Sequence, residues 1–139
     1  MKNKNKHFII VMMILAMIFM NNATCYAETS EMFFSLKSGE TKTGFAAKKS
    51  KANFEDLFYV RHIDCDPSSA SFRTQKYRSV YNGSVVSDTI SMFATSTDRK
   101  KAKYYPGKAM KEKTYSLRCT STSSTHKNEV IGVSGKWTP

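Results

Sequence analysis

The sequence predicts an all-β protein, folded as an antiparallel β-sandwich. Ser and Thr supply 29 of the 112 residues that follow position 27, and aromatic residues recur along the whole length. This composition fits pleated, half-buried strands. Strand-like runs recur roughly every ten residues with turn residues between them, as in sandwiches, and no long helical periodicity interrupts them. A small closed barrel is the alternative that these observations leave open.

Residues 1–27 are expected to be a secretory signal peptide. Lys2, Lys4 and Lys6 precede a run of 13 apolar residues, and a polar stretch that ends at Ala27 follows this run. The run is too short for a spanning helix, which needs about 20 apolar residues. We expect cleavage after Ala27, with a neighbouring site as the alternative. The mature chain is then secreted, either extracellular or associated with the cell wall.

Residues 28–139 are expected to form one β domain. The signal holds three of the 22 basic residues and none of the 11 acidic ones, which leaves a net charge of +8 on the mature chain. This length excludes a multidomain enzyme, a TIM barrel and a full dinucleotide-binding domain. A domain of this size buries only about two thirds of its unfolded surface, so a covalent cross-link would stabilise it.

Cysteine content predicts such a cross-link. Cleavage removes Cys25 and leaves Cys65 and Cys119. An even pair in an oxidising compartment predicts one disulfide bond. It would close a loop of 55 residues. For a loop of this length the chain-entropy model gives a stabilisation of roughly 4 kcal/mol. Two reduced thiols or a thiol nucleophile are the alternatives. No histidine cluster accompanies the pair, so we expect no metal site and no cofactor.

The first two strands are expected near the start of the domain. Residues 32–37 place Phe34 and Leu36 on one face, and a turn around Gly39 separates them from a weaker strand at residues 41–46. A polar, basic connection then leads to the next strand.

The third strand is expected within residues 54–64, because Leu57-Phe58-Tyr59-Val60 is a strong apolar and aromatic run. The residues before this run could instead open a short helix. A turn after Cys65 ends the segment.

A hairpin is expected in the middle of the chain. Residues 71–81 and 84–95 flank Asn82-Gly83, which favours a type I′ turn with positive φ at both positions. The alternation within 71–81 changes phase, and a bulge near Gln75 would reconcile its two halves.

Residues 97–103 are expected to form a charged turn. The strand after it, at residues 114–120, alternates cleanly and puts Tyr115, Leu117 and Cys119 on one face. That face should be the inner one, which places the predicted disulfide in or beside the core.

The last strand is expected at residues 129–137, with Ile131 and Val133 on one face. Trp137 lies at its end. A tryptophan at the end of a strand is more often packed over the core than exposed as a binding platform, so we expect Trp137 to be buried.

The chain also resembles a known family in the order of several short motifs. These are Phe34-Ser35-Leu36-Lys37, Val86-Ser87, Tyr115-Ser116-Leu117-Arg118 and Val133-x-Gly135-x-Trp137-x-Pro139. Their order resembles a family of small secreted proteins of unknown function from Gram-positive bacteria. The Gly-x-Trp pattern is loosely similar to that of lactococcin-type bacteriocins. The resemblance implies export and a Ser/Thr-rich β-sandwich, and it implies no catalytic residues.

Residue types that could carry catalysis are few. His62, His126 and Glu129, together with lysines, could supply the acid, base and charge stabilisation of a small ribonuclease. No Gly-x-Ser-x-Gly motif is present. We therefore expect a non-enzymatic protein, with a small extracellular nuclease or hydrolase as a distant alternative.

Basic residues are the most informative polar feature. Seven fall within residues 99–113, where Glu112 is the only acid, and a second cluster comprises Lys48, Lys49 and Lys51. Basic surfaces that bear aromatic rings suit anionic polymers of the wall or membrane. Nucleic acid is not expected, because no recognition motif is present. The residues expected to bind polyanions are Arg99, Lys100, Lys101, Lys103, Tyr104, Tyr105, Lys108, Lys111 and Lys113.

The sequence thus predicts a secreted protein that acts at the cell envelope and associates with anionic wall or membrane polymers. The runner-up is a bacteriocin-like secreted toxin, whose target would be the envelope of another cell.

Overall fold

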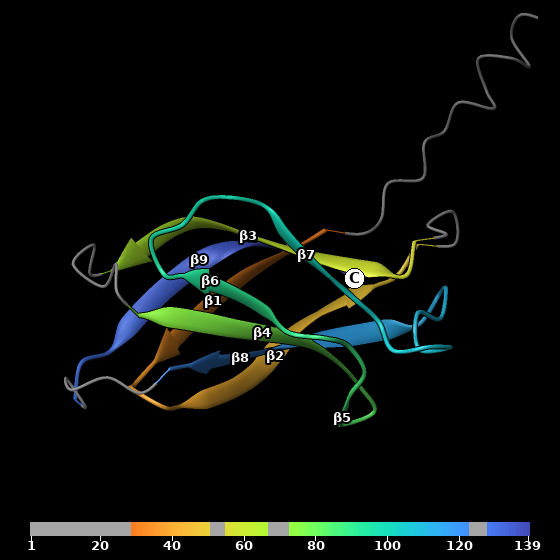
Figure 1. Ribbon diagram of the computed structural model, residues 1–139, viewed down its shortest axis with the longest axis horizontal. Coiled ribbons are helices and arrows are strands. Elements are labelled where there is room, and N and C mark those ends of the chain that lie inside the picture. Colours follow the sequence, from red (N-terminus) through yellow and green to blue (C-terminus); the bar gives the residue numbers. More distant parts are fainter. Residues whose placement is uncertain (1–28, 51–54, 67–72, 123–127) are drawn as a thin grey trace, which may run out of the picture.

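The computed structural model describes residues 29–50, 55–66, 73–122 and 128–139. Within these ranges all regular secondary structure is β, with nine strands and no helix (Figure 1). The strands are β1 (Ser30–Leu36), β2 (Thr41–Lys48), β3 (Leu57–Asp66), β4 (Thr74–Tyr81), β5 (Ser84–Val85), β6 (Ile90–Phe93), β7 (Lys100–Lys103), β8 (Thr114–Ser121) and β9 (Ile131–Thr138). The predicted all-β class is confirmed.

The strands form two antiparallel sheets rather than one closed sheet. Sheet A has the order β1-β9-β3-β7. Sheet B has the order β2-β8-β4-β5, and β6 also pairs with β4. In Figure 1, β3 and β9 lie in the upper part of the molecule, and β8 and β2 in the lower part. Strands close in sequence are therefore distributed between the two sheets.

The inner faces of the two sheets share one apolar core. The rings of Phe34 on β1 and Tyr77 on β4 approach to 6.1 Å between centroids. The predicted inner faces of β1, β8 and β9 are confirmed, since their alternating apolar residues are buried. Full burial of one such side chain stabilises the fold by about 1.5–3 kcal/mol.

The central hairpin has the predicted turn. Asn82 and Gly83 have φ values of 48° and 79°, and Tyr81 pairs with Ser84 across the turn. Both central residues of a type I′ turn need positive φ, which glycine adopts without strain and asparagine tolerates.

Trp137 is buried, as predicted, with 1% of its surface exposed. Its indole Nε1–H donates a hydrogen bond to the Phe45 carbonyl oxygen at 2.7 Å, which links β9 of sheet A to β2 of sheet B. Gly135, two residues earlier, has no room for a side chain, because a Cβ would lie 2.2 Å from the Arg61 carbonyl oxygen. The end of β9 therefore packs closely on both sides.

Three local predictions are wrong. Residues 97–103 are not only a turn, because β7 lies within them and pairs with β3. Residues 84–95 form two strands rather than one. The register of β4 with β8 runs without a shift from Gln75 to Val80, so no bulge lies there. Register shifts occur instead between Gly44 and Ala47 and within β3.

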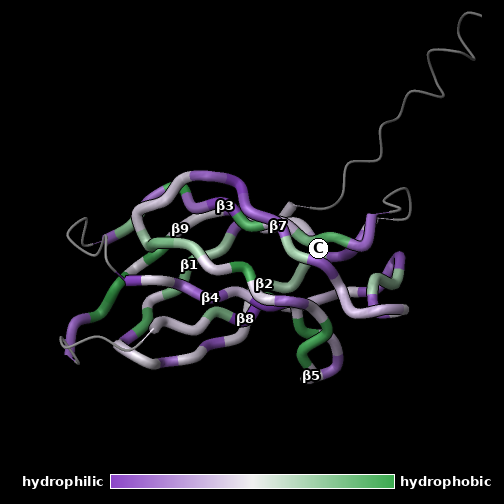
Figure 2. The backbone as a smooth tube through the Cα atoms, in the orientation of Figure 1, coloured by the Kyte–Doolittle hydropathy of each residue, from purple (hydrophilic) through white to green (hydrophobic). Residues whose placement is uncertain are grey.

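The error at β7 has a simple physical cause. Edge strands can be short and polar, because one side is open to solvent. Figure 2 shows a hydrophilic stretch leading from β6 into β7. Ala102 is the one residue of β7 that packs against the core, so no apolar alternation marks the strand.

Candidate functional site

Arg99 and the lysines of β7 lie at the edge of sheet A. Within β7, Lys101 pairs with Tyr59 and Lys103 pairs with Leu57. Because Ala102 between them faces the core, Lys101 and Lys103 lie on the outer face of the sheet. The Arg99 guanidinium carbon lies 3.9 Å from the centroid of the Tyr59 ring, in a cation–π contact, which brings Arg99 to the same face.

The register adds two further cations to this face. Arg61 on β3 is directly opposite Lys136 on β9, and both are exposed. Like charges directly opposite one another destabilise an antiparallel pair. We define the basic face as the five cations around Tyr59 on the outer side of sheet A: Arg61, Arg99, Lys101, Lys103 and Lys136.

Two acids border the basic face. Glu31 on β1 pairs in register with Lys136. Glu55 accepts a hydrogen bond from the Tyr59 hydroxyl. Burial, with that hydrogen bond, raises the pKa of Tyr59, so its hydroxyl remains a donor. The face therefore retains an excess of positive charge.

The arrangement is suited to an extended anionic chain. Adjacent strands lie about 4.8 Å apart, so cations on β7, β3 and β9 lie within one or two Debye lengths of each other at physiological salt. Repeated anionic groups of one polymer can then contact several cations at once. Exposed cations of this kind contribute through summed Coulomb attraction rather than through one strong contact.

Lys100 contributes less to this face. It lies on the opposite side of β7 from Lys101, and its Nζ is 3.7 Å from a carboxylate oxygen of Asp98. Both side chains are exposed, and such a surface pair contributes little to stability.

The remaining predicted lysines lie elsewhere. Lys108, Lys111 and Lys113 are exposed in the connection between β7 and β8. This connection lies beside the end of β2 in sheet B, where Glu112 forms an ion pair with Lys48 at 2.7 Å. The linear cluster is thus divided between two sheets.

The two predicted tyrosines have different positions. Tyr105 is 40% exposed, whereas Tyr104 is buried with 4% exposed, so Tyr104 does not belong to the binding surface. Its hydroxyl lies 3.2 Å from the Ser79 hydroxyl oxygen, and the Lys49 ammonium lies 5.1 Å from its ring centroid. Lys49 is itself buried, which removes it from the second basic cluster. Lys51 lies outside the described residues.

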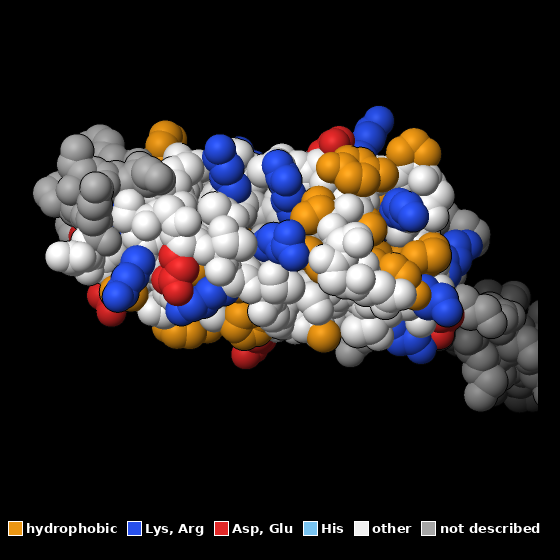
Figure 3. Space-filling model, turned by 90° about the horizontal axis from the view of Figure 1, so that it is seen from below, with side chains coloured by type: hydrophobic (Ala, Val, Ile, Leu, Met, Phe, Trp, Pro, Cys, Tyr) orange, Lys and Arg blue, Asp and Glu red, His pale blue; other side chains and the backbone are white. Residues whose placement is uncertain are grey.

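Basic side chains also occur away from sheet A. The side of the molecule seen from below Figure 1 carries several Lys and Arg side chains, together with fewer acidic ones (Figure 3). Clustering in the sequence is therefore a poor guide to clustering in space.

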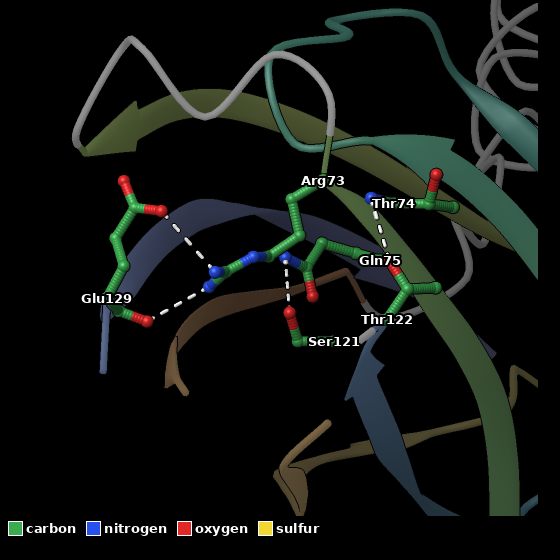
Figure 4. A network of polar contacts seen from close by, with 6 residues as sticks. All are labelled: Arg73, Thr74, Gln75, Ser121, Thr122 and Glu129. Carbon is green, nitrogen blue, oxygen red and sulfur yellow. Dashed lines mark hydrogen bonds and ion pairs between the residues drawn. The ribbon is translucent and has the colours of Figure 1, made fainter. Parts of the chain in front are cut away.

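His62 and Glu129, which the nuclease hypothesis would need for catalysis, make contacts within the fold instead. His62 is buried, and burial lowers its pKa to about 4. Glu129 accepts hydrogen bonds from buried Arg73 at 3.0 Å through its carbonyl oxygen and at 3.4 Å through its carboxylate (Figure 4). His126 lies outside the described residues. In this position only 1% of the surface of His62 is exposed to solvent.

Cys65 and Cys119 are both thiols in the structure. Cys119 on β8 is buried, and Cys65 on β3 packs with Ala94, Ile131 and Val133. The two cysteines therefore belong to different sheets. Burial raises the pKa of both thiols, that of Cys119 to about 12, which opposes a role as a nucleophilic thiolate. The disulfide bond stays a prediction.

The described ranges hold no group of three or more His, Cys, Asp or Glu side chains that could bind a metal ion. They also contain no helix long and apolar enough to cross a membrane.

Two cations of the basic face, Arg61 and Lys136, were not predicted as site residues, and neither was Tyr59 at its centre. Tyr59 and Arg61 alternate along one strand, which is a weak signal for a shared face. Their meeting with Lys136 depends on a register between distant strands. No family model matches this chain, and no curated protein or solved structure matches it.

Proposed function

We propose that this chain is a secreted, non-enzymatic β-sandwich protein that associates with anionic wall or membrane polymers through the basic face of sheet A. The observation that carries the proposal is the direct pairing of Arg61 with Lys136 beside Lys101 and Arg99. A sheet gains nothing from placing like charges opposite one another. Glu31, in register with Lys136, offsets one of these charges, and an anionic partner would offset the others.

The net charge of the mature chain supports the same proposal. An excess of basic residues attracts anionic surfaces over the whole molecule. The signal peptide predicted at residues 1–27 would export the chain to a compartment where such polymers are exposed.

A bacteriocin-like toxin is the second candidate, and one observation favours it. Phe33 and Ile63 are 58% and 57% exposed, and they line a hollow of about 400 Å³ beside β1 and β9. Exposed apolar surface of this kind is typical of proteins that meet a membrane or a partner.

Binding of residues 28–139 to bacterial walls tests the main proposal. Walls that retain their anionic polymers should bind the protein at low salt, and walls stripped of these polymers should not. Binding should fall strongly at 1 M salt, where the Debye length is about 3 Å. Absence of binding to intact walls and to anionic vesicles at low salt would remove the proposal. Release of dye from anionic vesicles would favour the toxin.

A further inference from the structure

A second basic cluster lies on the outer face of sheet B, far in sequence from residues 99–103. Lys76 and Arg78 alternate with buried residues along β4, so their side chains share the outer face. Arg118 on β8 is directly opposite Arg78 in the register. We define the sheet B triad as Lys76, Arg78 and Arg118. Figure 3 shows the side of the molecule on which β2 and β8 lie, with Lys and Arg side chains across its middle.

No acid neutralises the sheet B triad within the described part of the chain. The ion pairs found there involve other residues. The pairing of Arg78 with Arg118 therefore places two like charges opposite each other without compensation, which destabilises the sheet. This arrangement is expected where an external anion completes the charge balance.

Threonines hold both guanidinium groups in place. Arg78 Nε donates to the Thr89 hydroxyl oxygen at 2.6 Å, and Arg118 Nε donates to the Thr43 hydroxyl oxygen at 3.1 Å. These bonds use the Nε–H groups and leave the terminal N–H groups available as donors to a ligand. A guanidinium that is oriented in advance loses less side-chain entropy when it binds an oxyanion.

The triad surrounds a hollow of about 270 Å³. Its lining consists of three cations and two threonines: Thr41, Lys76, Arg78, Arg118 and Thr120. The hydroxyl oxygens of Thr41 and Thr120 lie 2.8 Å apart and are hydrogen-bonded to each other. The hollow thus offers positive charge and hydroxyl groups, with neither a carboxylate nor an apolar side chain in its lining.

We propose that the sheet B triad is a binding site for a phosphate group carried on a polyol, a sugar or a lipid. A phosphate monoester offers three terminal oxygens to the three cations, and inorganic phosphate offers four, whereas a carboxylate offers only two. Arginine side chains bind phosphate oxygens through paired N–H donors, and Lys76 adds a point charge. The threonine hydroxyls can bond to hydroxyl groups of the carrier. The site is separate from the basic face, because the two lie on the outer faces of different sheets.

Titration of residues 28–139 with inorganic phosphate, at constant ionic strength set with sodium chloride, tests the site. We expect saturable shifts of the Nε–Hε NMR signals of Arg78 and Arg118. Phosphate should also raise the melting temperature relative to chloride, because a ligand of the native state stabilises it. Glycerol 3-phosphate should bind more tightly than inorganic phosphate, because the threonine hydroxyls can also bond to its hydroxyl groups.

Two variants of the triad and one control variant show whether the triad causes the effect. Arg78→Gln with Arg118→Gln should weaken phosphate binding at least about tenfold. Single Arg118→Gln should melt at or above the wild-type temperature in chloride and lose the rise that phosphate causes. If Arg118 had only a structural role, its replacement would instead lower the melting temperature. Lys101→Gln with Lys103→Gln removes equal charge from the basic face and should leave the phosphate shifts unchanged.

Non-saturable shifts, equal shifts with chloride, or unchanged binding in the double variant would overturn the site. Vesicles that contain phosphatidic acid, whose phosphate is a monoester, and soluble glycerol 3-phosphate distinguish a lipid headgroup from a free phosphate ester. The outcome is separable from that of the proposed function. Basic-face variants that still show the phosphate shifts test wall binding alone. Triad variants that still bind walls test the phosphate site alone.

Discussion

His62 on β3 of sheet A and Tyr77 on β4 of sheet B join the two sheets through a buried hydrogen bond, with 2.7 Å between His62 Nε2 and the Tyr77 hydroxyl oxygen. His62 Nδ1 lies 3.0 Å from the Ala94 carbonyl oxygen. A carbonyl can only accept, so we assign the proton to Nδ1 and infer that Nε2 accepts from Tyr77. In this assignment the imidazole is neutral, in agreement with the lowered pKa of His62.

Acid should weaken the fold through His62. Burial lowers its pKa to about 4, from 6.5 in the unfolded chain, so the unfolded state binds more protons between these values. Stability is complete above about pH 7 and is lost as the pH falls towards 4, by about 3 kcal/mol. Urea unfolding at a series of pH values measures this loss.

His62→Asn is the matched control for the acid effect. Asn can donate to the Ala94 carbonyl but does not titrate, so its stability should be nearly flat between pH 7 and 5. Glu40 titrates at lower pH, because a hydrogen bond from the Lys37 backbone lowers its pKa below 4.5. A wild-type protein with no slope above pH 5 would refute the assignment to His62.

Trp137 should be the most costly aromatic residue to truncate. Trp137→Ala removes a fully buried side chain and should lower the free energy of unfolding by about 3–5 kcal/mol. Trp137→Phe keeps most of the packing, loses the bond to the Phe45 carbonyl and should cost about 1–3 kcal/mol. Denaturant titration checks both values, and an unchanged midpoint for Trp137→Ala would contradict the packing described here.

Replacement of Lys49 by methionine should stabilise the protein. Its ammonium nitrogen is buried and has no hydrogen-bond partner among the residues that the structure describes, and burial lowers its pKa. Lys49→Met keeps the packed side-chain stem and removes the buried charge, for a gain of about 1 kcal/mol after loss of the contact with Tyr104. Exposed Lys48→Met is the control and should change stability by less. Thermal unfolding that shows Lys49→Met to be destabilised would mean that the ammonium has a favourable partner.

Stability should also rise with pH because of Lys49. Its pKa is lowered in the folded state, so the unfolded state binds the extra proton as the pH approaches 10.5. The rise should be absent in Lys49→Met.

The secreted chain should begin at Glu28 and contain a disulfide bond. Mass spectrometry of culture supernatant should find residues 28–139, lighter by two hydrogen atoms than the reduced form. Such a bond would link β3 of sheet A to β8 of sheet B, because Cys65 and Cys119 lie on those strands. Alkylation of two thiols in the native secreted protein would refute the disulfide, and retention of residues 8–20 would refute the signal peptide.

The strand faces of the core could be predicted because burial has a period of two. Phe34 and Leu36 on β1, and Ile131 and Val133 on β9, show this period in the sequence and are buried in the structure. The hairpin at Asn82 was predictable for a related reason, since its turn type demands particular residues.

The site was only partly predictable, because it depends on register. Arg61 and Lys136 are 75 positions apart in the sequence and meet only because β3 pairs with β9. The burial of Lys49 could not be predicted either, since nothing in a run of polar residues distinguishes a buried lysine from an exposed one. Strand alternation at positions 76 and 78 was a readable signal for the sheet B triad, but the partner Arg118 again required the register.

The central claim is that the basic face binds anionic polymer as a patch, and matched charge removal tests it most directly. Arg61→Gln, Arg99→Gln and Lys101→Gln together remove three charges from the face. Lys37→Gln, Lys108→Gln and Lys113→Gln remove three exposed charges elsewhere. Each exposed substitution should change stability by at most about 1 kcal/mol, the largest value being for Arg99, which loses its contact with Tyr59, so differences in binding report the surface.

The decisive measurement is the affinity of both triple variants for anionic walls at low salt. The account predicts that the face variant binds at least about tenfold more weakly than the wild type, and that the control variant loses much less. Equal losses in the two variants would contradict the account and reduce the attraction to net charge alone.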